Sequence, residues 1–196
     1  MTDGNCPALV IVLGPPGSGK TTLARRIARE FRMPLIAKDD IKESLFETLG
    51  SQDRAWSQKL GRATFELLYY FVETQIAVGR SLIAECNFDN EHATPRFHAL
   101  QNKFDFEPFQ ILCDAPDEIL VQRFRTRWES GKRHRGHVDE QIAPEEFTNI
   151  LKHYQAPLDI GGKVIKIDTT NFEQVNYIEL FRELAQALNR TEARSE

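Results

Sequence analysis

The sequence contains little cysteine, and its cysteines show no disulfide pattern. Its 196 residues include three cysteines, Cys6, Cys86 and Cys113, and no two of them form a C-x-x-C pair. Small proteins held together by disulfides carry many more cysteines for their length. The sequence therefore excludes a disulfide framework and favours folding in a reducing compartment.

Long apolar runs, a leader segment and an excess of basic charge are also missing. No apolar run reaches the roughly 18 residues that a membrane span needs. The first residues lack the basic stretch and apolar run of a signal peptide, so we expect a cytoplasmic location. The formal net charge of −4 argues against bulk, sequence-independent binding to nucleic acid.

Internal repeats, low-complexity tracts and linkers rich in proline, glycine and serine are absent as well. Hydrophobic residues make up 41% and charged residues 28% of the chain, an ordinary balance for a globular protein. A chain of this length can bury one sizeable core but is short for two. The sequence predicts a single domain over residues 1–196.

A glycine-rich stretch near the N-terminus matches the phosphate-binding pattern G-x-x-x-x-G-K-[ST] at every fixed position. A β-branched apolar run over 8–13 precedes it, and Leu23, Ile27 and Phe31 follow it at helical spacing. The match should arise by chance in only about 1% of chains of this length. The candidate nucleotide-binding residues are Gly14, Pro15, Pro16, Gly17, Ser18, Gly19, Lys20, Thr21 and Thr22.

Each residue type in this stretch suits the binding of a polyphosphate. Gly17 and Gly19 let the backbone adopt conformations that other residues avoid and approach the ligand closely. Backbone N–H groups and the positive end of the following helix attract phosphate. Lys20 is placed to reach the β- and γ-phosphates, and the Thr21 hydroxyl to bind Mg²⁺.

Predicted strands and helices alternate along the chain. The strands are expected at 8–13, 35–37, 81–86, 109–113 and 164–168. Helices are expected at 20–32, from about 40, and at 54–78, 91–102, 116–130, 144–154 and 173–188. Such alternation is typical of a parallel sheet with helices on both faces, and its sites lie at the carboxyl ends of the strands.

Acidic residues follow two of these predicted strands. Asp39 and Asp40 come after the second strand, where a carboxylate could take the proton of an acceptor hydroxyl. One of the pair could equally cap the next helix, and we assign this role mainly to Asp40. Glu85 ends the third strand, where an acidic residue can serve a metal ion, but its role stays open.

A basic segment follows the fourth predicted strand. Leu120, Phe124 and Trp128 fall on one helical face that we expect in the core, while Arg123 and Arg127 share a neighbouring face. Residues 123–137 hold six Lys and Arg against one acid. Such a run is often a solvated surface.

In a protein with a phosphate loop, the basic run favours a lid over about 128–143 that closes on the nucleotide. Gly131 and Gly136 bracket the basic loop and could be its hinges. His134 and His137 lie in the same loop, and we expect both to be exposed.

Three of these stretches together resemble a known group of proteins. They are Gly14 to Thr22, Lys38-Asp39-Asp40-Ile41-Lys42, and Arg123 to Arg127 ahead of the basic segment. The chain looks like a small P-loop kinase of the group that includes polynucleotide 5′-hydroxyl kinases, zeta toxins and chloramphenicol phosphotransferase, whose members are often described as AAA-type ATPases.

The resemblance implies a three-layer αβα P-loop fold of the nucleoside-monophosphate-kinase type. It also implies a five-stranded parallel sheet in the order 2-3-1-4-5 and a helical lid. By analogy Asp39 is the base that activates the acceptor hydroxyl. Lys42 stands where polynucleotide kinases carry an arginine for the acceptor phosphate, a departure that weakens the nucleic-acid version.

The sequence therefore predicts an enzyme that transfers the γ-phosphoryl group of ATP, with Mg²⁺, to a hydroxyl of a small-molecule acceptor. Its expected catalytic residues are Lys20, Asp39, Arg123 and Arg127, with Thr21 at the metal. The alternatives are a kinase of polynucleotide 5′ ends and a nucleotide-dependent switch. A monomer or dimer without membrane attachment is expected, and the acceptor is not identified.

Overall fold

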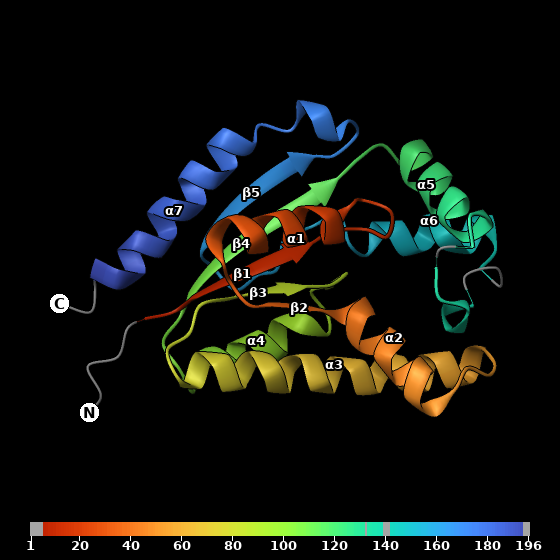
Figure 1. The fold of residues 1–196 in the computed structure, drawn as a ribbon, viewed down its shortest axis with the longest axis horizontal. Helices are drawn as coiled ribbons and strands as arrows, with labels where there is room; N and C mark the ends of the chain where they lie inside the picture. Colours follow the sequence, from red (N-terminus) through yellow and green to blue (C-terminus); the bar gives the residue numbers. More distant parts are fainter. Residues whose placement is uncertain (1–5, 132, 139–141, 194–196) are drawn as a thin grey trace.

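The computed structural model describes residues 6–131, 133–138 and 142–193. A parallel sheet of five strands in the order β2-β3-β1-β4-β5 forms its centre, as the sequence predicts (Figure 1). The strands are Ala8–Leu13 (β1), Leu35–Ala37 (β2), Leu82–Glu85 (β3), Glu107–Asp114 (β4) and Lys163–Asp168 (β5). The helical elements are Lys20–Phe31 (α1), Lys38–Leu49 (α2), Arg54–Ala77 (α3), Ala93–Gln101 (α4), Asp117–Glu129 (α5), Arg135–His137 (η1), Pro144–Lys152 (α6), Phe172–Gln174 (η3) and Tyr177–Ala193 (α7).

The central strand β1 explains why its sequence is apolar without alternation. It pairs in parallel with β3 on one side and with β4 on the other, and all six of its residues are buried. A strand with neighbours on both edges and helices on both faces has no solvent-facing side. The carboxyl ends of β1, β3 and β4 therefore meet at one edge, where the loop after β1 begins.

Two hydrophobic layers hold the helices against the sheet. On one face, α3 and α4 pack on the strands through residues such as Leu68, Val72 and Phe97. On the other face, α1 and α7 pack through residues such as Leu23 and Leu184. Figure 1 shows α3 and α4 on one side of the sheet and α1 and α7 on the other. Cys6, Cys86 and Cys113 are buried, and none of them forms a disulfide among the described residues.

The start of α2 corrects one prediction from the sequence. The helix begins at Lys38, and the residue before it, Ala37, makes no side-chain cap. Asp40 therefore lies inside the first turn, and its carboxylate pairs with the Arg25 guanidinium of α1 at 2.8 Å. The assignment of Asp40 as helix cap is wrong, because the chain turns into the helix directly from β2.

The helices α5 and α6 stand beyond the carboxyl edge of the sheet and share a small core of their own. Leu120 of α5 and Phe147 of α6 are buried in this core, and the ring centres of Phe124 and Phe147 stack at 4.0 Å. Trp128 is 45% exposed, so its predicted place in the core is wrong. It lies one turn beyond this contact with α6, toward the end of α5. Positions 132 and 139–141 of the predicted lid lie outside the described residues.

A buried amide anchors the loop between α6 and β5. Gln110 of β4 is fully buried, and its Oε1 accepts a hydrogen bond from the Leu158 backbone N–H at 2.8 Å. Its Nε2 donates to the carbonyl oxygens of Leu158 at 2.9 Å and Gly161 at 3.2 Å.

Among the described residues, no helix combines the length and apolar character that a membrane span needs.

Candidate active site

The phosphate-binding motif forms the loop between β1 and α1. Gly14, Gly17 and Gly19 all have positive φ angles, at 136°, 84° and 76°. The Lys20 side chain folds back over the loop, and its Nζ donates to the Pro15 carbonyl oxygen at 2.9 Å. Ser18 Oγ is buried and has no hydrogen-bond partner among the described residues. The loop therefore presents an ammonium and an unsatisfied hydroxyl at the N-terminus of α1, which suits an anion.

At two positions of this loop, close neighbours as well as the backbone angle exclude any residue larger than glycine. A Cβ on Gly17 would lie 2.9 Å from the Leu120 carbonyl oxygen of α5. A Cβ on Gly19 would lie 2.1 Å from the ring of Phe172, which follows β5. The loop is thus packed between α5 and the segment after β5, and a larger residue would push these elements apart.

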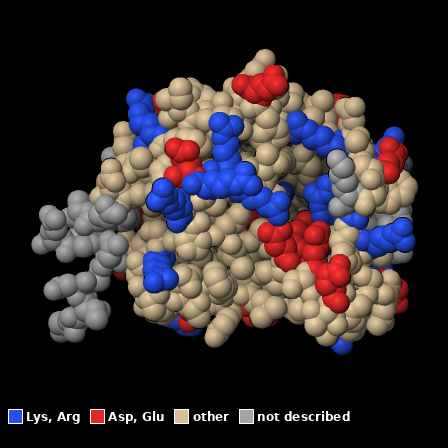
Figure 2. All heavy atoms as spheres, viewed as in Figure 1, with Lys and Arg blue, Asp and Glu red and all other residues tan. Residues whose placement is uncertain are grey.

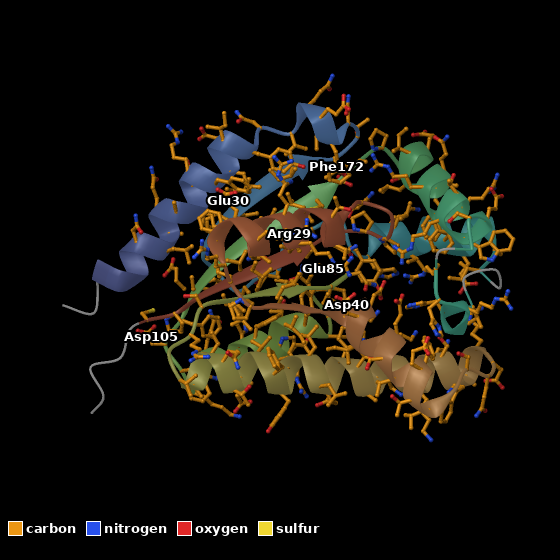
Figure 3. The ribbon with its side chains drawn as sticks, viewed as in Figure 1. Arg29, Glu30, Asp40, Glu85, Asp105 and Phe172 are labelled. Carbon is orange, nitrogen blue, oxygen red and sulfur yellow. The ribbon has the colours of Figure 1, made fainter. Side chains whose placement is uncertain are left out.

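Thr21 and Glu85 meet directly beneath the loop. The Thr21 hydroxyl donates to Glu85 Oε2 at 2.9 Å, and Glu85 is 4% exposed at the end of β3 (Figure 3). Burial raises the pKa of Glu85, an effect that the charge of Lys20 and the Thr21 hydrogen bond only partly offset. The structure thus places Glu85, whose role the sequence leaves open, in direct contact with Thr21.

A hydroxyl and a carboxylate are oxygen donors of the kind that Mg²⁺ prefers, so this pair fits the metal that the motif implies. Among the described residues, no three side chains of His, Cys, Asp or Glu form a metal-binding group. Mg²⁺ in phosphoryl-transfer sites commonly takes one or two protein ligands and completes its shell with phosphate and water. The two side chains therefore suffice for an ion carried by a nucleotide.

A cavity of about 540 Å³ opens beside the loop and reaches from α2 and α3 to α5 and α6. Figure 2 shows basic side chains bordering a hollow on this face, with an acidic patch next to it. The basic residues that line the cavity are Lys20, Lys38, Lys42, Arg54, Arg123, Arg127 and Arg133, and the acidic ones are Asp39 and Glu85. This strong excess of positive charge fits a polyanionic ligand.

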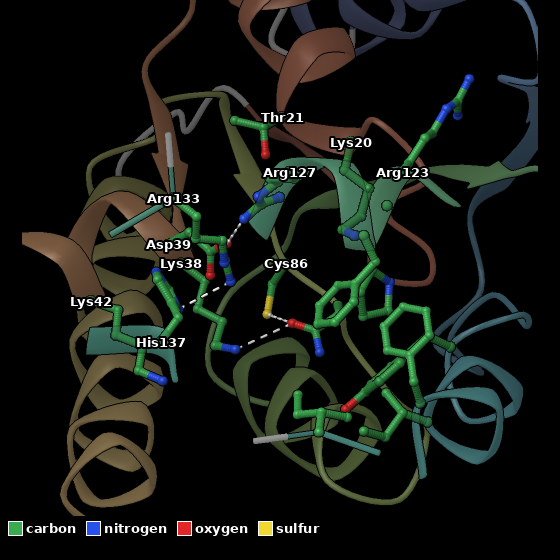
Figure 4. Close-up of a pocket in the computed structure, with 18 of the residues that line it drawn as sticks. Lys20, Thr21, Lys38, Asp39, Lys42, Cys86, Arg123, Arg127, Arg133 and His137 are labelled. Atoms are coloured by element: carbon green, nitrogen blue, oxygen red, sulfur yellow. Dashed lines mark hydrogen bonds and ion pairs between the residues drawn. The ribbon is translucent and has the colours of Figure 1, made fainter. Parts of the chain in front are cut away.

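Asp39 lies on the wall of the cavity formed by the first turn of α2 (Figure 4). Its Oδ2 accepts from Arg133 Nη1 at 2.8 Å and lies 3.3 Å from Arg127 Nη2. Burial pushes the pKa of Asp39 upward, but the charges of Arg133, Lys38 and other nearby groups outweigh it and hold the pKa below its usual value. The carboxylate is therefore ionised at neutral pH.

Arg123 and Arg127, which the sequence places on one helical face, have different neighbours. Arg123 Nη2 donates to the carbonyl oxygens of Thr169 at 2.7 Å and Thr170 at 3.0 Å, after β5. Its guanidinium lies 5.6 Å from the centre of the Phe172 ring, and its buried Nη1 has no partner among the described residues. Arg127 reaches across the cavity toward Asp39 instead. Both arginines line the same cavity as Lys20.

The prediction that His134 and His137 are exposed is wrong for His137 and only partly met by His134. The side chain of His137 is 4% exposed and that of His134 is 22% exposed. Both rings pack against Phe46 of α2, His134 stacked at 5.1 Å and His137 edge-on at 5.5 Å. Sequence reasoning missed Phe46, because nothing near it in the chain signals a partner some ninety residues away.

The wall of the cavity opposite Lys38 is apolar. Ile142, Phe147, Ile150 and Tyr154 from α6 and its flanks line it together with Phe124 of α5. Asn87 lies between the two walls, where its Oδ1 accepts from Lys38 Nζ at 3.3 Å. The cavity thus has the glycine-rich loop at one end and a second end that is basic on one side and apolar on the other.

Comparison with known proteins agrees with this geometry. A family model described as an AAA domain matches residues 9–157, more than half of the chain. The chain belongs to this AAA domain family. The crystal structure of a "putative kinase" from Chloroflexus aurantiacus j-10-fl has a TM-score of 0.87 and 38% identity to it, over 93% of this chain and 98% of that one. These findings confirm the resemblance to small P-loop kinases.

Similarity at lower identity extends to a curated protein and to a further solved structure. The adenylate kinase of Rickettsia africae (strain ESF-5) is 28% identical over 128 residues, 61% of this chain and 58% of that protein. The chain thus spans little more than half the length of this relative. The structure of Chaetomium thermophilum Kti12 in complex with ADP-AlF3 has a TM-score of 0.61 at 18% identity, over 93% and 99% of the two chains, a likeness of fold alone.

Proposed function

We propose that the protein is an ATP-dependent kinase that transfers the γ-phosphoryl group to a hydroxyl of a small-molecule acceptor. The observation that carries this proposal is the pairing of two features in one cavity. Lys20 of the phosphate loop and the ionised carboxylate of Asp39 line it together. A loop that only binds nucleotide has no use for a carboxylate there, because it repels the phosphates.

The phosphate end of the cavity has the parts needed to bind a triphosphate. The backbone N–H groups of the loop and Lys20 bind the β- and γ-phosphates in this proposal, and Ser18 offers its unsatisfied hydroxyl. Thr21 and Glu85 would hold Mg²⁺, which supplies positive charge at the phosphates when bound. Arg123 holds the segment after β5, and its Nη1 amino group, which has no partner among the described residues, is assigned to the nucleotide in this proposal.

Asp39 serves as the base for the acceptor in this proposal. The acceptor hydroxyl gives its proton to the carboxylate while its oxygen forms a bond to the γ-phosphorus, and the bond between that phosphorus and the ADP oxygen breaks. Lys20 and Arg127 stabilise the charge that spreads over the transferred group. The products are ADP and the phosphorylated acceptor, with the proton left on Asp39 for release.

The apolar wall supports a small molecule as the acceptor. Phe124, Phe147 and Ile150 offer a nonpolar surface next to the place assigned to the acceptor hydroxyl. Such a wall fits the apolar body of a small organic molecule and gives no reason for a sugar–phosphate chain. An acceptor with a hydroxyl near a nonpolar ring or chain suits both walls of the cavity.

A screen with γ-labelled ATP tests the proposal. Purified protein is incubated with Mg²⁺ and separate pools of nucleosides, sugars, hydroxylated antibiotics and oligonucleotides with a free 5′-hydroxyl, and label transfer is measured. We expect transfer to a small molecule. Transfer to the oligonucleotides alone would favour the polynucleotide kinase, and ATP turnover that no pool increases would favour a nucleotide switch.

A matched pair of variants tests the base. Asp39→Asn should keep binding of a non-hydrolysable ATP analogue and lower label transfer by about 10²-fold or more, because an amide cannot take the proton. Asp40→Asn is the control, since this neighbour pairs with Arg25 in an exposed position. Exposed ion pairs of this kind contribute little to the stability of the fold. Equal rates in the two variants would contradict the role of Asp39.

A further inference from the structure

A short segment of the chain, residues 133–138, is docked on α2 next to the candidate base. We call it the lid tip. Phe46 of α2 is 2% exposed and lies between the stacked ring of His134 and the edge-on ring of His137. A Cβ on Gly136 would lie 2.6 Å from the Phe46 ring, so the backbone of the lid tip rests directly on this ring. The docking has a close, specific fit.

The docked lid tip delivers Arg133 to Asp39. The Arg133 side chain is 14% exposed, and its Nη1 donates to Asp39 Oδ2 at 2.8 Å. Its other amino group, Nη2, contacts His137 Nδ1 at 3.0 Å (Figure 4). The two terminal amino groups of the guanidinium are thus directed at different partners. One partner is the candidate base, and the other is a ring fixed against α2.

The position of the proton on His137 follows from these contacts. A guanidinium can only donate hydrogen bonds, so Nδ1 must be the accepting nitrogen of a neutral ring. The proton then sits on Nε2, which donates to Glu43 Oε1 at 3.0 Å. Burial and the charge of Arg133 lower the pKa of His137 to about 3, which agrees with a neutral ring. Glu43, His137, Arg133 and Asp39 are thus connected by hydrogen bonds, with Arg133 donating both to Asp39 and to His137 and His137 donating to Glu43.

These hydrogen bonds leave one oxygen of the Asp39 carboxylate for substrate. Arg133 and Arg127 both approach Oδ2 of Asp39. Within the described parts of the chain, no hydrogen bond to Oδ1 is present. We propose that Arg133 is a positioning residue that holds Asp39 by Oδ2 and keeps Oδ1 for the acceptor hydroxyl, and that His137 and Glu43 hold Arg133 in turn. The proposal rests on the proposed function, in which Asp39 is the base.

The first test is a double-mutant cycle on ADP formation from ATP and Mg²⁺, with water as the acceptor. Arg133→Met keeps most of the side-chain stem and removes the guanidinium. We expect it to lower the rate about tenfold or more in the wild-type background. In the Asp39→Asn background it should change the rate by less than about twofold, because its partner is already disabled. Binding of a non-hydrolysable ATP analogue should stay unchanged in both backgrounds.

The outcomes separate the failure of the inference from that of the proposed function. A normal rate in Asp39→Asn alone would overturn the base and the inference together. A reduced rate in Asp39→Asn, with a further large loss on adding Arg133→Met, would overturn only the inference. Arg133 would then contact the phosphates itself, and binding of the ATP analogue would weaken as well.

The second test measures the titration of the Asp39 carboxyl group without any reaction. The ¹³C NMR signal of the Asp39 carboxyl group is titrated with acid in the full chain without nucleotide. Charged or titratable groups face Asp39 from several elements. The basic ones are Lys20 of α1, Lys38 of α2, Arg127 of α5, and Arg133 and His137 of the lid tip, and the acidic ones are Glu43 of α2 and Glu85 of β3. Removing Arg133 takes away the largest stabilising charge, so Arg133→Met should move the Asp39 titration to higher pH.

Two further variants complete this test. Arg25→Met is the control, because it removes an arginine that pairs with Asp40, the next residue, and should leave the Asp39 titration in place. His137→Phe keeps a ring against Phe46 but cannot accept from Arg133, and should lower the rate of ADP formation about threefold or more. An Asp39 titration unmoved by Arg133→Met, or a wild-type rate in His137→Phe, would overturn the inference.

Discussion

Gly136 offers a sharp test of how the lid tip docks on α2. A Cβ at this position would lie 2.6 Å from Phe46 Cγ and 2.7 Å from both Cδ atoms, well inside van der Waals contact. The ring cannot swing aside easily, since the rings of His134 and His137 flank it. Gly136 is not among the glycines with positive φ, so the collision alone opposes an alanine there.

The expected cost of Gly136→Ala is that of overpacking, about 1–3 kcal/mol. The lid tip can relieve the collision by leaving α2, so the loss should fall on docking and leave global unfolding unchanged. A change of this size lowers the docked population relative to the undocked one by about 5- to 150-fold. Hydrogen exchange at the amides of His137 and Val138, which donate to His134 and Arg135, should accelerate accordingly.

Gly131→Ala is the matched control for this experiment. Gly131 has a φ of 64°, so alanine is strained there, but its Cβ would meet no atom of the described residues within 4 Å. The exchange rates of His137 and Val138 should therefore stay close to those of the wild type. Unchanged exchange in Gly136→Ala, or the same acceleration in both variants, would refute the view that contact with Phe46 fixes the lid tip.

Three further predictions concern the nucleotide end of the cavity. Lys20→Ala should nearly abolish ADP formation while the thermal unfolding midpoint stays near that of the wild type, because the ammonium donates to Pro15 of its own loop; a normal rate would remove the loop from the mechanism. Excess EDTA should stop ADP formation, and added Mg²⁺ or Mn²⁺ should restore it; full activity in EDTA would contradict a metal at Thr21 and Glu85. Arg123→Ala and Arg127→Ala should each lower the rate of ADP formation, by up to about 10³-fold; wild-type rates in both would mark the basic segment as a solvated surface.

The parts of the fold that the sequence predicts well are those fixed by neighbouring residues. The run 8–13, the glycine loop and the helix after it depend on local backbone preferences and on burial on both faces, and the structure has them at β1 and α1. The strand order follows from the resemblance and is confirmed. Strand ends shift by a residue or two, as in β4, which begins at Glu107 instead of 109.

The predictions that fail depend on contacts between distant parts of the chain. Asp40 resembles a helix cap in sequence, but its carboxylate forms an ion pair with Arg25 of α1. His137 belongs to a polar, basic stretch, and only the approach of Phe46 makes it a buried ring. Arg123 and Arg127 are one helical turn apart, yet the segment after β5 binds one and Asp39 attracts the other. No local pattern carries this information.

Gln110 has a mechanical consequence for the elements above the cavity. The chain leaves the sheet at the end of β4, passes through α5, η1 and α6, and is tied to the sheet again at Leu158 by the buried amide. A buried amide that loses its partners costs about 1–3 kcal/mol, so this attachment resists being pulled loose. Any hinge movement of α5 and α6 therefore takes place between two points that are fixed to the sheet, the end of β4 and Leu158.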